Sequence, residues 1–227
     1  MKFSSFVLFY INLEKVIAKM VKESVQNNMT STKQLDQFDQ LQENIRNCRL
    51  CKDLFDFEPH PIVFGNRHSK IMHISQAPSQ NVYHTGKPFH DLSGKRLREE
   101  WYQVRDETFY NADNFYIVSI AHCYPGKNPK GGDRLPPTDC AKRWLTQILP
   151  LVDNDIYLLV GSTAAKYFYP KQKFIDLVFQ NNNLNGKPAY VLPHPSPLNI
   201  KWFRDHPEFI NHRMIEIRQV IHKVLHL

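Results

Sequence analysis

The chain has 227 residues, of which 42% are hydrophobic, 12% aromatic and 22% charged. This composition is typical of a globular protein and excludes a disordered, collagen-like or repeat-fibre chain. Lysine and arginine outnumber aspartate and glutamate by 29 to 22, which gives a net charge of +7 with histidine neutral. That excess is compatible with a polyanionic partner, although many soluble proteins without one carry as much.

Residues 1–30 differ from the rest of the chain. The apolar run at 6–13 is too short for a transmembrane helix, and no clear signal-peptide cleavage site follows it. We expect an N-terminal extension, either an amphipathic helix or the product of an upstream start, with Met20 and Met29 as alternative starts. It holds four lysines and two glutamates, so residues 31–227, the expected main domain, keep a net charge of +5.

The main domain is predicted to begin with a helix and to continue with alternating strands and helices. Ser31 or Thr32 could cap the first helix, in which apolar residues recur at helical spacing as far as Ile45. Four short apolar runs predict buried strands at 70–75, 114–121, 156–161 and 189–192. Further helices are expected at 94–102, 138–149, 162–168 and 209–227. The asparagine run at 181–183 is interpreted as a turn.

This alternation predicts the fold class. Short apolar strands between helices indicate a three-layer α/β/α domain with a central, mainly parallel four-stranded sheet. In such sheets, ligands bind beyond the carboxyl ends of the strands. The loops expected there are rich in proline, glycine, histidine and serine, and they cover residues 76–91, 122–137, 161–162 and 193–199.

The four cysteines form one pattern. Cys48 and Cys51 are a C-x2-C pair, a spacing that allows both sulfurs to face one metal centre. Cys123 follows the second predicted strand, and Cys140 opens the next predicted helix. An iron–sulfur cluster, a zinc site and four reduced thiols all remain open, with a metal site favoured. Disulfides are less expected, because nothing marks the chain as secreted.

Four loop segments carry a resemblance to a known family. They read SQAPS at residues 75–79, GKPFHD at 86–91, GS at 161–162 and HPSPL at 194–198. Together with the cysteines, they resemble the uracil-DNA glycosylase superfamily. The resemblance is strongest to its branch with a [4Fe–4S] cluster, called family 4, and next strongest to the related family 5. The resemblance runs from about Leu41 to Leu198.

The resemblance implies roles for particular residues. The ring of Phe89 would stack on an everted base, with Ala77 and Pro78 of the first loop also against the substrate. His194 would stabilise negative charge on the base as the glycosidic bond breaks. Three further roles complete the set: Leu198 as a wedge in the duplex, Ser162 and Ser196 as phosphate ligands, and Cys48, Cys51, Cys123 and Cys140 as cluster ligands in a structural role.

Two positions depart from the pattern of that family. Family 4 enzymes carry glutamate at the place of Gln76, and other branches carry aspartate at the place of Ala77. Loss of such a carboxylate typically costs about 10²–10⁴-fold in rate. Ser119 stands where the family places a base-reading asparagine, and serine cannot supply the same paired donor and acceptor.

Asp91 offers one compensation for the missing acid. It lies two residues after Phe89, and we hypothesise that its carboxylate, with Gln76, acts near the attacking water. The equal alternative is that Asp91 caps the helix that opens near Ser93. The weaker candidates for the acid are His84, His90 and Asp133.

Other residues keep two interpretations. Leu198 could instead cover an apolar cluster with Trp202 and Phe203. The basic group Lys87, Lys95, Arg96 and Arg98 could contact DNA or form a solvated helix face.

The leading hypothesis is an intracellular, cytoplasmic DNA glycosylase that removes uracil or another deaminated base from single- or double-stranded DNA. We expect a monomer with a [4Fe–4S] cluster and no membrane association, with zinc as the alternative metal. The main alternative is a weak or inactive homologue that binds nucleic acid without releasing a base. An unrelated zinc-stabilised hydrolase is a third, less favoured hypothesis.

Overall fold

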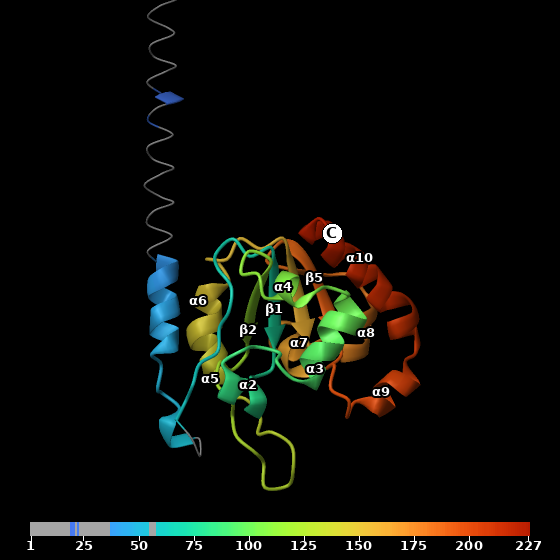
Figure 1. Cartoon of the computed structure of the whole chain (residues 1–227), viewed down its shortest axis with the longest axis horizontal. Coiled ribbons are helices and arrows are strands. Elements are labelled where there is room, and N and C mark those ends of the chain that lie inside the picture. The colour runs from blue at the N-terminus through green and yellow to red at the C-terminus, as the bar shows by residue number, and fades with distance from the viewer. Residues whose placement is uncertain (1–18, 21, 23–36, 55–57) are drawn as a thin grey trace, which may run out of the picture. The chain divides into compact units, whose positions relative to one another are not determined.

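The structure is a computed structural model that describes residues 19–20, 22, 37–54 and 58–227 (Figure 1). The chain divides into two compact units, residues 1–40 and residues 41–227. In the first unit, Lys19, Met20, Lys22 and residues 37–40 are described, and they are helical. The predicted cap at Ser31 or Thr32 and most of the predicted extension lie outside the described residues. None of the described helices combines the length and apolarity needed to cross a membrane.

The second unit contains one five-stranded sheet, with strands in the order β2-β1-β3-β5-β4. Its strands are β1 (Ile71–Ser75), β2 (Phe115–Ser119), β3 (Ile156–Val160), β4 (Asn182–Leu184) and β5 (Lys187–Leu192). The first three strands and β5 pair in parallel, and β4 pairs antiparallel with β5. The α/β prediction is confirmed, with one added edge strand where a turn was predicted.

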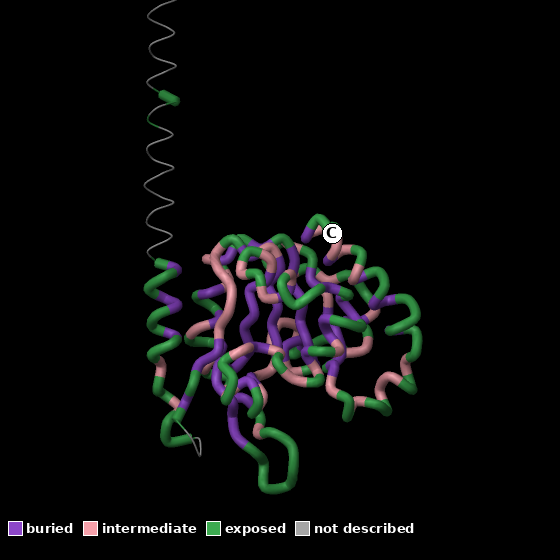
Figure 2. Tube along the Cα trace, viewed as in Figure 1, coloured by how far each residue is buried: buried purple, intermediate pink, exposed green. Residues whose placement is uncertain are grey.

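The strands form because their residues are apolar and buried on both faces. Every residue of β1, β2 and β3 is buried, as a parallel sheet covered by helices requires. In Figure 2, strands β1, β2 and β3 are buried, whereas residues 127–133, in the loop between β2 and the next helix, are exposed. Strand β4 is only partly buried, so its polar sequence gives no strand signal of this kind.

Short helices connect the strands. After η1 (Lys52–Leu54), they are α2 (Gln80–Thr85), α3 (Leu92–Lys95), η2 (Arg96–Tyr102), α4 (Asp106–Phe109), α5 (Thr138–Cys140), η3 (Ala141–Leu145), α6 (Thr146–Ile148), α7 (Ser162–Phe168), α8 (Phe174–Phe179), α9 (Ile200–Asp205), η4 (Phe209–Arg213) and α10 (Met214–Leu225). The predicted helices at 94–102, 138–149, 162–168 and 209–227 are all present. Three of them include π-helical turns, in η2, η3 and η4.

The helices lie on both sides of the sheet. Figure 1 shows the strands between α5 and α6 on one side and α3, α9 and α10 on the other. The connection β1–β2 and the connection β2–β3 run in opposite directions across the sheet. Right-handed crossovers therefore place their helices on opposite faces. The result is the expected three-layer arrangement.

The two faces of β2 show how the layers are held. Phe115 stacks on Tyr102 of η2 at 6.3 Å between ring centroids. The next residue, Tyr116, points to the opposite face, where its hydroxyl accepts a hydrogen bond from the side chain of Gln42. Residues 62–64 run antiparallel along β2, with Phe64 bridged to Ile117. This arrangement aligns the carboxyl ends of β1 and β2, where the candidate site lies.

Candidate functional site

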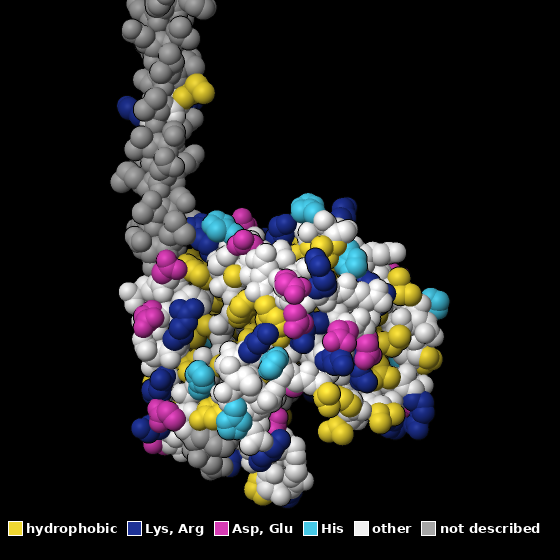
Figure 3. Space-filling model, in the orientation of Figure 1, with side chains coloured by type: hydrophobic (Ala, Val, Ile, Leu, Met, Phe, Trp, Pro, Cys, Tyr) yellow, Lys and Arg dark blue, Asp and Glu magenta, His cyan; other side chains and the backbone are white. Residues whose placement is uncertain are grey.

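A cavity of about 210 Å³ opens at the carboxyl ends of β1 and β2. It lies between the loop that follows β2 and the loop that follows β5. The loop that follows β2 projects downward in Figure 3, and the surface beside it is hollowed. Eight residues predicted for the site line it: Gln76, Ala77, Pro78, Phe89, Asp91, Ser119, His194 and Ser196. Three of the four predicted post-strand loops, at 76–91, 122–137 and 193–199, therefore converge on one cavity.

Phe89 is held in an unusual backbone conformation at the cavity wall. Its φ of 53° lies in the left-handed region, which costs a residue with a side chain about 1–2 kcal/mol. The buried guanidinium of Arg98 donates a hydrogen bond to the Phe89 carbonyl at 2.8 Å and also binds Asp106 at 2.6 Å. Gly94 leaves the space that this backbone needs, because a Cβ there would lie 1.6 Å from the Phe89 oxygen.

The ring of Phe89 is supported from behind by buried aromatic side chains. It packs edge-on against His73 at 4.8 Å between ring centroids and lies 6.4 Å from the ring of Phe109. Burial lowers the pKa of His73 to about 3, so this imidazole is neutral, and it hydrogen bonds to the Tyr102 hydroxyl at 3.0 Å. The Phe89 ring is thus a fixed apolar wall of the cavity.

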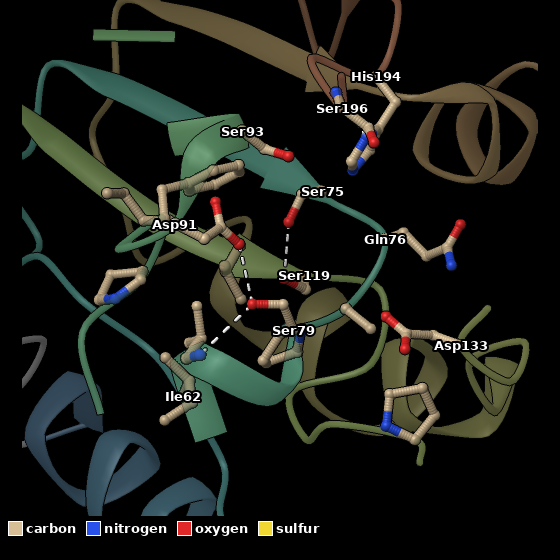
Figure 4. Close-up of a pocket in the computed structure, with 18 residues that line it drawn as sticks. Ile62, Ser75, Gln76, Ser79, Asp91, Ser93, Ser119, Asp133, His194 and Ser196 are labelled. Atoms are coloured by element: carbon tan, nitrogen blue, oxygen red, sulfur yellow. Dashed lines mark hydrogen bonds between the residues drawn. The ribbon is translucent and has the colours of Figure 1, made fainter. Parts of the chain in front are cut away.

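Asp91 is confirmed as a helix cap. One carboxylate oxygen accepts a hydrogen bond from the Gly94 backbone at 2.9 Å, which caps α3. The other accepts from the Ser79 hydroxyl at 2.9 Å, and Ser79 in turn caps α2. Because Asp91 also lines the cavity (Figure 4), the cap does not remove the carboxylate from the site.

Gln76 takes the place of the expected acid and has a fixed partner. Its side-chain oxygen accepts a hydrogen bond from the Thr163 hydroxyl of α7 at 2.6 Å. The amide NH₂ group of Gln76 remains as a donor. In Figure 4, Gln76 and Asp91 lie on opposite sides of the cavity, with Ser75 and Ser119 between them in the view.

Ser75 and Ser119 end the neighbouring strands β1 and β2. They face each other in the strand register, and their hydroxyl oxygens are 2.8 Å apart, with either able to donate. Both residues are buried, at 5% and 6% exposed, and both line the cavity. At Ser119, where the resemblance implies a base-reading asparagine, the chain thus has a hydroxyl paired with that of Ser75.

His194 lies at the cavity mouth in the loop after β5. Its surroundings desolvate the imidazole and lower its pKa, against the opposing influence of Asp91 and then Asp133. The Ser196 backbone N–H donates to Nδ1 at 3.2 Å. The neutral ring therefore carries its proton on Nε2, as assigned from this hydrogen bond. His194 is a hydrogen-bond donor at neutral pH.

Arg96 positions the loop that carries His194. Its guanidinium donates to the carbonyls of Pro195 at 3.2 Å and Ser196 at 3.4 Å. It also pairs with Glu100 at 3.6 Å. The members of the predicted basic group therefore differ in their contacts. Arg96 and Arg98 bind backbone carbonyls of loops at the site, whereas Lys95 pairs with Glu99 on an exposed helix face.

Asp133 brings a second carboxylate to the cavity from the loop after β2. It accepts hydrogen bonds from Lys127 at 2.7 Å and from the Tyr124 hydroxyl at 3.3 Å. These contacts anchor the base of the projecting loop. Asp133 was a weaker candidate for the missing acid, and the structure places it at the cavity beside a lysine.

Two predicted site residues lie outside the cavity. Leu198 is 92% exposed, so it does not cover the apolar cluster of Trp202 and Phe203. Ser162 is exposed at the start of α7. Their predicted contacts with DNA remain predictions.

The four cysteines surround a second, small apolar cavity. Cys48, Cys51, Cys123 and Cys140 all line it, and all are free thiols. Burial, followed by the neighbouring thiols, raises the pKa of Cys123, and burial raises that of Cys140 to about 11. Within the described part of the chain, no three histidine, cysteine or acidic side chains are placed to hold a single metal ion. The four cysteine thiols around one cavity are nevertheless a donor set of the kind that binds metal groups as thiolates.

Sequence reasoning missed Ser75 and Ser79, which line the cavity, and Thr163, which bonds to Gln76. Ser75 read as the end of an apolar strand, and its role depends on which strand lies beside it. Ser79 carried a signal, because serine three residues before a helical amide is a common cap. Thr163 carried no such signal, since its contact with Gln76 joins segments that are far apart in the sequence.

The fold and the cavity define an α/β protein with a candidate ligand site, lined by polar and aromatic side chains, at the carboxyl ends of its parallel strands. The family model described as "Uracil DNA glycosylase superfamily" matches residues 62–218. Because that match covers most of the chain, the protein belongs to the uracil-DNA glycosylase superfamily.

Curated relatives agree with this membership at modest identity. A protein of Saccharolobus solfataricus named Type-4 uracil-DNA glycosylase is 26% identical over 175 residues, covering 71% of this chain and 77% of the relative. Proteins of the same name from Thermotoga maritima and Sulfurisphaera tokodaii are 24% and 23% identical. Those alignments cover 69% and 60% of this chain and 80% and 60% of the respective relatives.

Proposed function

We propose that this protein binds DNA and hydrolyses the N-glycosidic bond of uracil or another deaminated base. One observation carries the proposal: the cavity gathers a fixed aromatic wall, a neutral histidine donor and a carboxylate. The relatives named uracil-DNA glycosylases support the class of reaction. A base must leave the duplex to enter such a cavity, at a cost of a few kcal/mol that stacking and edge contacts offset.

In this proposal, Phe89 and His194 act on the base. The Phe89 ring supplies the surface on which the extruded base stacks. The Nε2–H of His194 donates a hydrogen bond to a carbonyl oxygen of the base, where negative charge develops as the bond breaks. The lowered pKa of His194 keeps this group neutral and able to donate near pH 7.

Asp91 and Gln76 act on the water and the sugar. A carboxylate has about four acceptor positions, and Asp91 uses two of them, for Gly94 and Ser79. The remaining positions can accept a proton from water and oppose the positive charge that develops on the sugar. The free NH₂ group of Gln76 can orient the water but cannot accept its proton.

Leu198, Ser162 and Ser196 act on the DNA strand in this proposal. Leu198 fills the space that the extruded base leaves, and an apolar wedge of this kind offsets part of the lost stacking. Ser162 and Ser196 bind phosphates.

The alternative is a homologue that binds nucleic acid without releasing a base. The capping role of Asp91 favours it, because both carboxylate oxygens already serve the structure. Glutamine at position 76 also removes the acid that the resemblance implies. The two functions share the same cavity and differ only in turnover.

Base release from oligonucleotides that carry one uracil separates these functions. The measured product is the abasic site, detected by alkaline cleavage of single- and double-stranded substrates. We expect product with the wild-type chain and a loss of about 10²–10⁴-fold with Asp91→Asn. Asparagine caps helices as well as aspartate does, so this variant removes the charge and keeps the cap. Asp153→Asn, at an exposed carboxylate, is the matched control.

The absence of product on uracil, hypoxanthine and xanthine would overturn the enzyme proposal. Tight, salt-sensitive binding of the same oligonucleotides would then select the alternative. Activity that survives in Asp91→Asn would show that Asp91 is a cap alone.

We also propose that Cys48, Cys51, Cys123 and Cys140 hold a [4Fe–4S] cluster. Four thiols around one apolar cavity match the ligand number of such clusters. The cluster would supply no step of the reaction and would join residues 48–51 to the loop after β2. Iron with acid-labile sulfide in the purified protein is the expected result. Zinc alone would identify the alternative metal, and Cys51→Ser should lower the content of the bound group.

A further inference from the structure

The floor of the cavity is formed by the hydroxyls of Ser75 and Ser119, which no assigned role explains together. Their oxygens are 2.8 Å apart, at the ends of two adjacent parallel strands. Both side chains are buried except where they meet the cavity. Figure 4 shows the pair near the centre of the view, between Asp91 and Gln76.

The chemistry of a hydroxyl pair differs from that of an amide. Each hydroxyl has one donor and two acceptor positions. Their mutual hydrogen bond uses one donor and one acceptor, so the pair offers the cavity one O–H donor and several lone pairs. Rotating both hydroxyls moves the free donor from one serine to the other. An asparagine presents a donor and an acceptor in an order that its neighbours fix.

We propose that the Ser75–Ser119 pair contacts the hydrogen-bonding edge of the extruded base and accepts either order of donor and acceptor. The cavity would then bind a pyrimidine base with either an N–H beside a carbonyl, as in uracil, or an unprotonated nitrogen beside an amino group, as in cytosine. The cavity selects bases by shape and stacking rather than by the polarity of this edge. This inference rests on the proposed function, because it requires a base in the cavity.

The backbone around the pair supports a fixed floor. The Ile120 N–H donates to the Ser75 carbonyl at 2.9 Å, so the two strands remain joined beyond the hydroxyls. The reversal therefore needs only hydroxyl rotation, with no movement of the sheet. By contrast, a well-placed bidentate contact of fixed polarity discriminates between bases by roughly tenfold or more.

Equilibrium binding tests the inference without requiring turnover. The probes are single-stranded deoxyadenosine oligomers with one central residue: 2′-fluoro-deoxyuridine, 2′-fluoro-deoxycytidine, or a tetrahydrofuran that carries no base. The 2′-fluorine suppresses cleavage, and the tetrahydrofuran oligomer measures binding to the strand alone. We expect the uracil and cytosine probes to bind within about tenfold of each other, and both more tightly than the tetrahydrofuran probe.

Variants assign the effect to the pair. Ser119→Asn should introduce a preference of about tenfold or more for one of the two bases, as expected for a fixed contact. Ser75→Ala keeps one rotating hydroxyl, so it should weaken both probes to a similar degree. This smaller change keeps the test decisive if Ser119→Asn does not fold.

Three results would count against the inference in distinguishable ways. A wild-type preference of about a hundredfold for either base would overturn the reversible pair and leave the proposed function standing. If Ser75→Ala weakened the binding of one base probe much more than that of the other, the reversible pair would likewise be overturned and the proposed function would stand. Equal binding of all three probes would show that no base enters the cavity, and the proposed function would fall with the inference.

Discussion

Gly94 is the position where one methyl group should disturb the site most. A Cβ built there lies 1.6 Å from the Phe89 oxygen and 2.5 Å from the Phe89 carbonyl carbon. Gly94→Ala must therefore move these atoms apart by about 1.4 Å to reach the 3.0 Å that real contacts allow. The Phe89 backbone cannot yield freely, because its carbonyl is bound to Arg98 at 2.8 Å.

Opposing contributions determine whether this substitution raises or lowers the free energy of unfolding. Alanine in place of glycine stabilises a helix by about 1 kcal/mol. Overpacking costs about 1–3 kcal/mol, and losing a hydrogen bond to a charged group costs about 1.5–3 kcal/mol. The clash dominates, and we expect the free energy of unfolding to fall by roughly 2–5 kcal/mol. A shift of about 1 Å in the stacking ring should lower base release about 10²-fold.

Urea denaturation and single-turnover base release measure the two effects of Gly94→Ala. Gly186→Ala is the matched control, because its Cβ meets nothing within 4 Å although its φ is +80°. The control should lose only about 1–2 kcal/mol of stability, from its left-handed backbone, and keep full activity. A Gly94→Ala protein as stable and as active as wild type would refute the assigned packing around Phe89.

The other predictions concern stability, pH and the duplex. Arg98→Met leaves the Phe89 carbonyl and Asp106 without their donor, and should lower the unfolding free energy by about 2–4 kcal/mol in urea denaturation; no loss of stability would contradict this role. His73 has a pKa of about 3 against about 6.5 when unfolded, so unfolding takes up a proton between these values and stability falls as pH drops below about 6.5. His73→Gln should flatten that dependence in urea titrations from pH 7 to pH 4, and an unchanged slope would exclude His73 as its source. Leu198→Ala should lower base release from double-stranded more than from single-stranded oligonucleotides, with unchanged stability because the side chain is 92% exposed; an equal loss on both substrates would argue against a wedge.

The sheet could be predicted from the sequence because burial on both faces leaves an apolar run. Strands β1, β2, β3 and β5 each gave that signal, and their post-strand loops led to Gln76 and His194. Strand β4 could not be found in this way, since it pairs at the edge and its residues are only partly buried. The signal for a strand depends on how many faces are covered.

The partners of the site residues could not be predicted. Ser75 meets Ser119 only because β1 lies beside β2 in the sheet, and Thr163 meets Gln76 across 87 positions of sequence. Arg98 belonged to a basic group predicted either to contact DNA or to form a solvated helix face, yet its side chain is 7% exposed and binds the Phe89 carbonyl. Such pairings depend on strand order and helix orientation, which local patterns leave open.

The polar groups of the cavity are already paired with one another. Ser75 bonds to Ser119, Ser79 to Asp91 and Gln76 to Thr163. Each pair is held without a ligand, so under the proposed function a base and a water would meet a preorganised surface and use only the donor and acceptor positions that remain. A carboxylate and a hydroxyl pair keep such positions, because their oxygens have more lone pairs than the protein occupies. Under the proposed function, the chain can therefore lack the acid and the amide that the resemblance implies at Gln76 and Ser119, with Asp91 as the proposed proton acceptor and the Ser75–Ser119 pair as the proposed contact to the base.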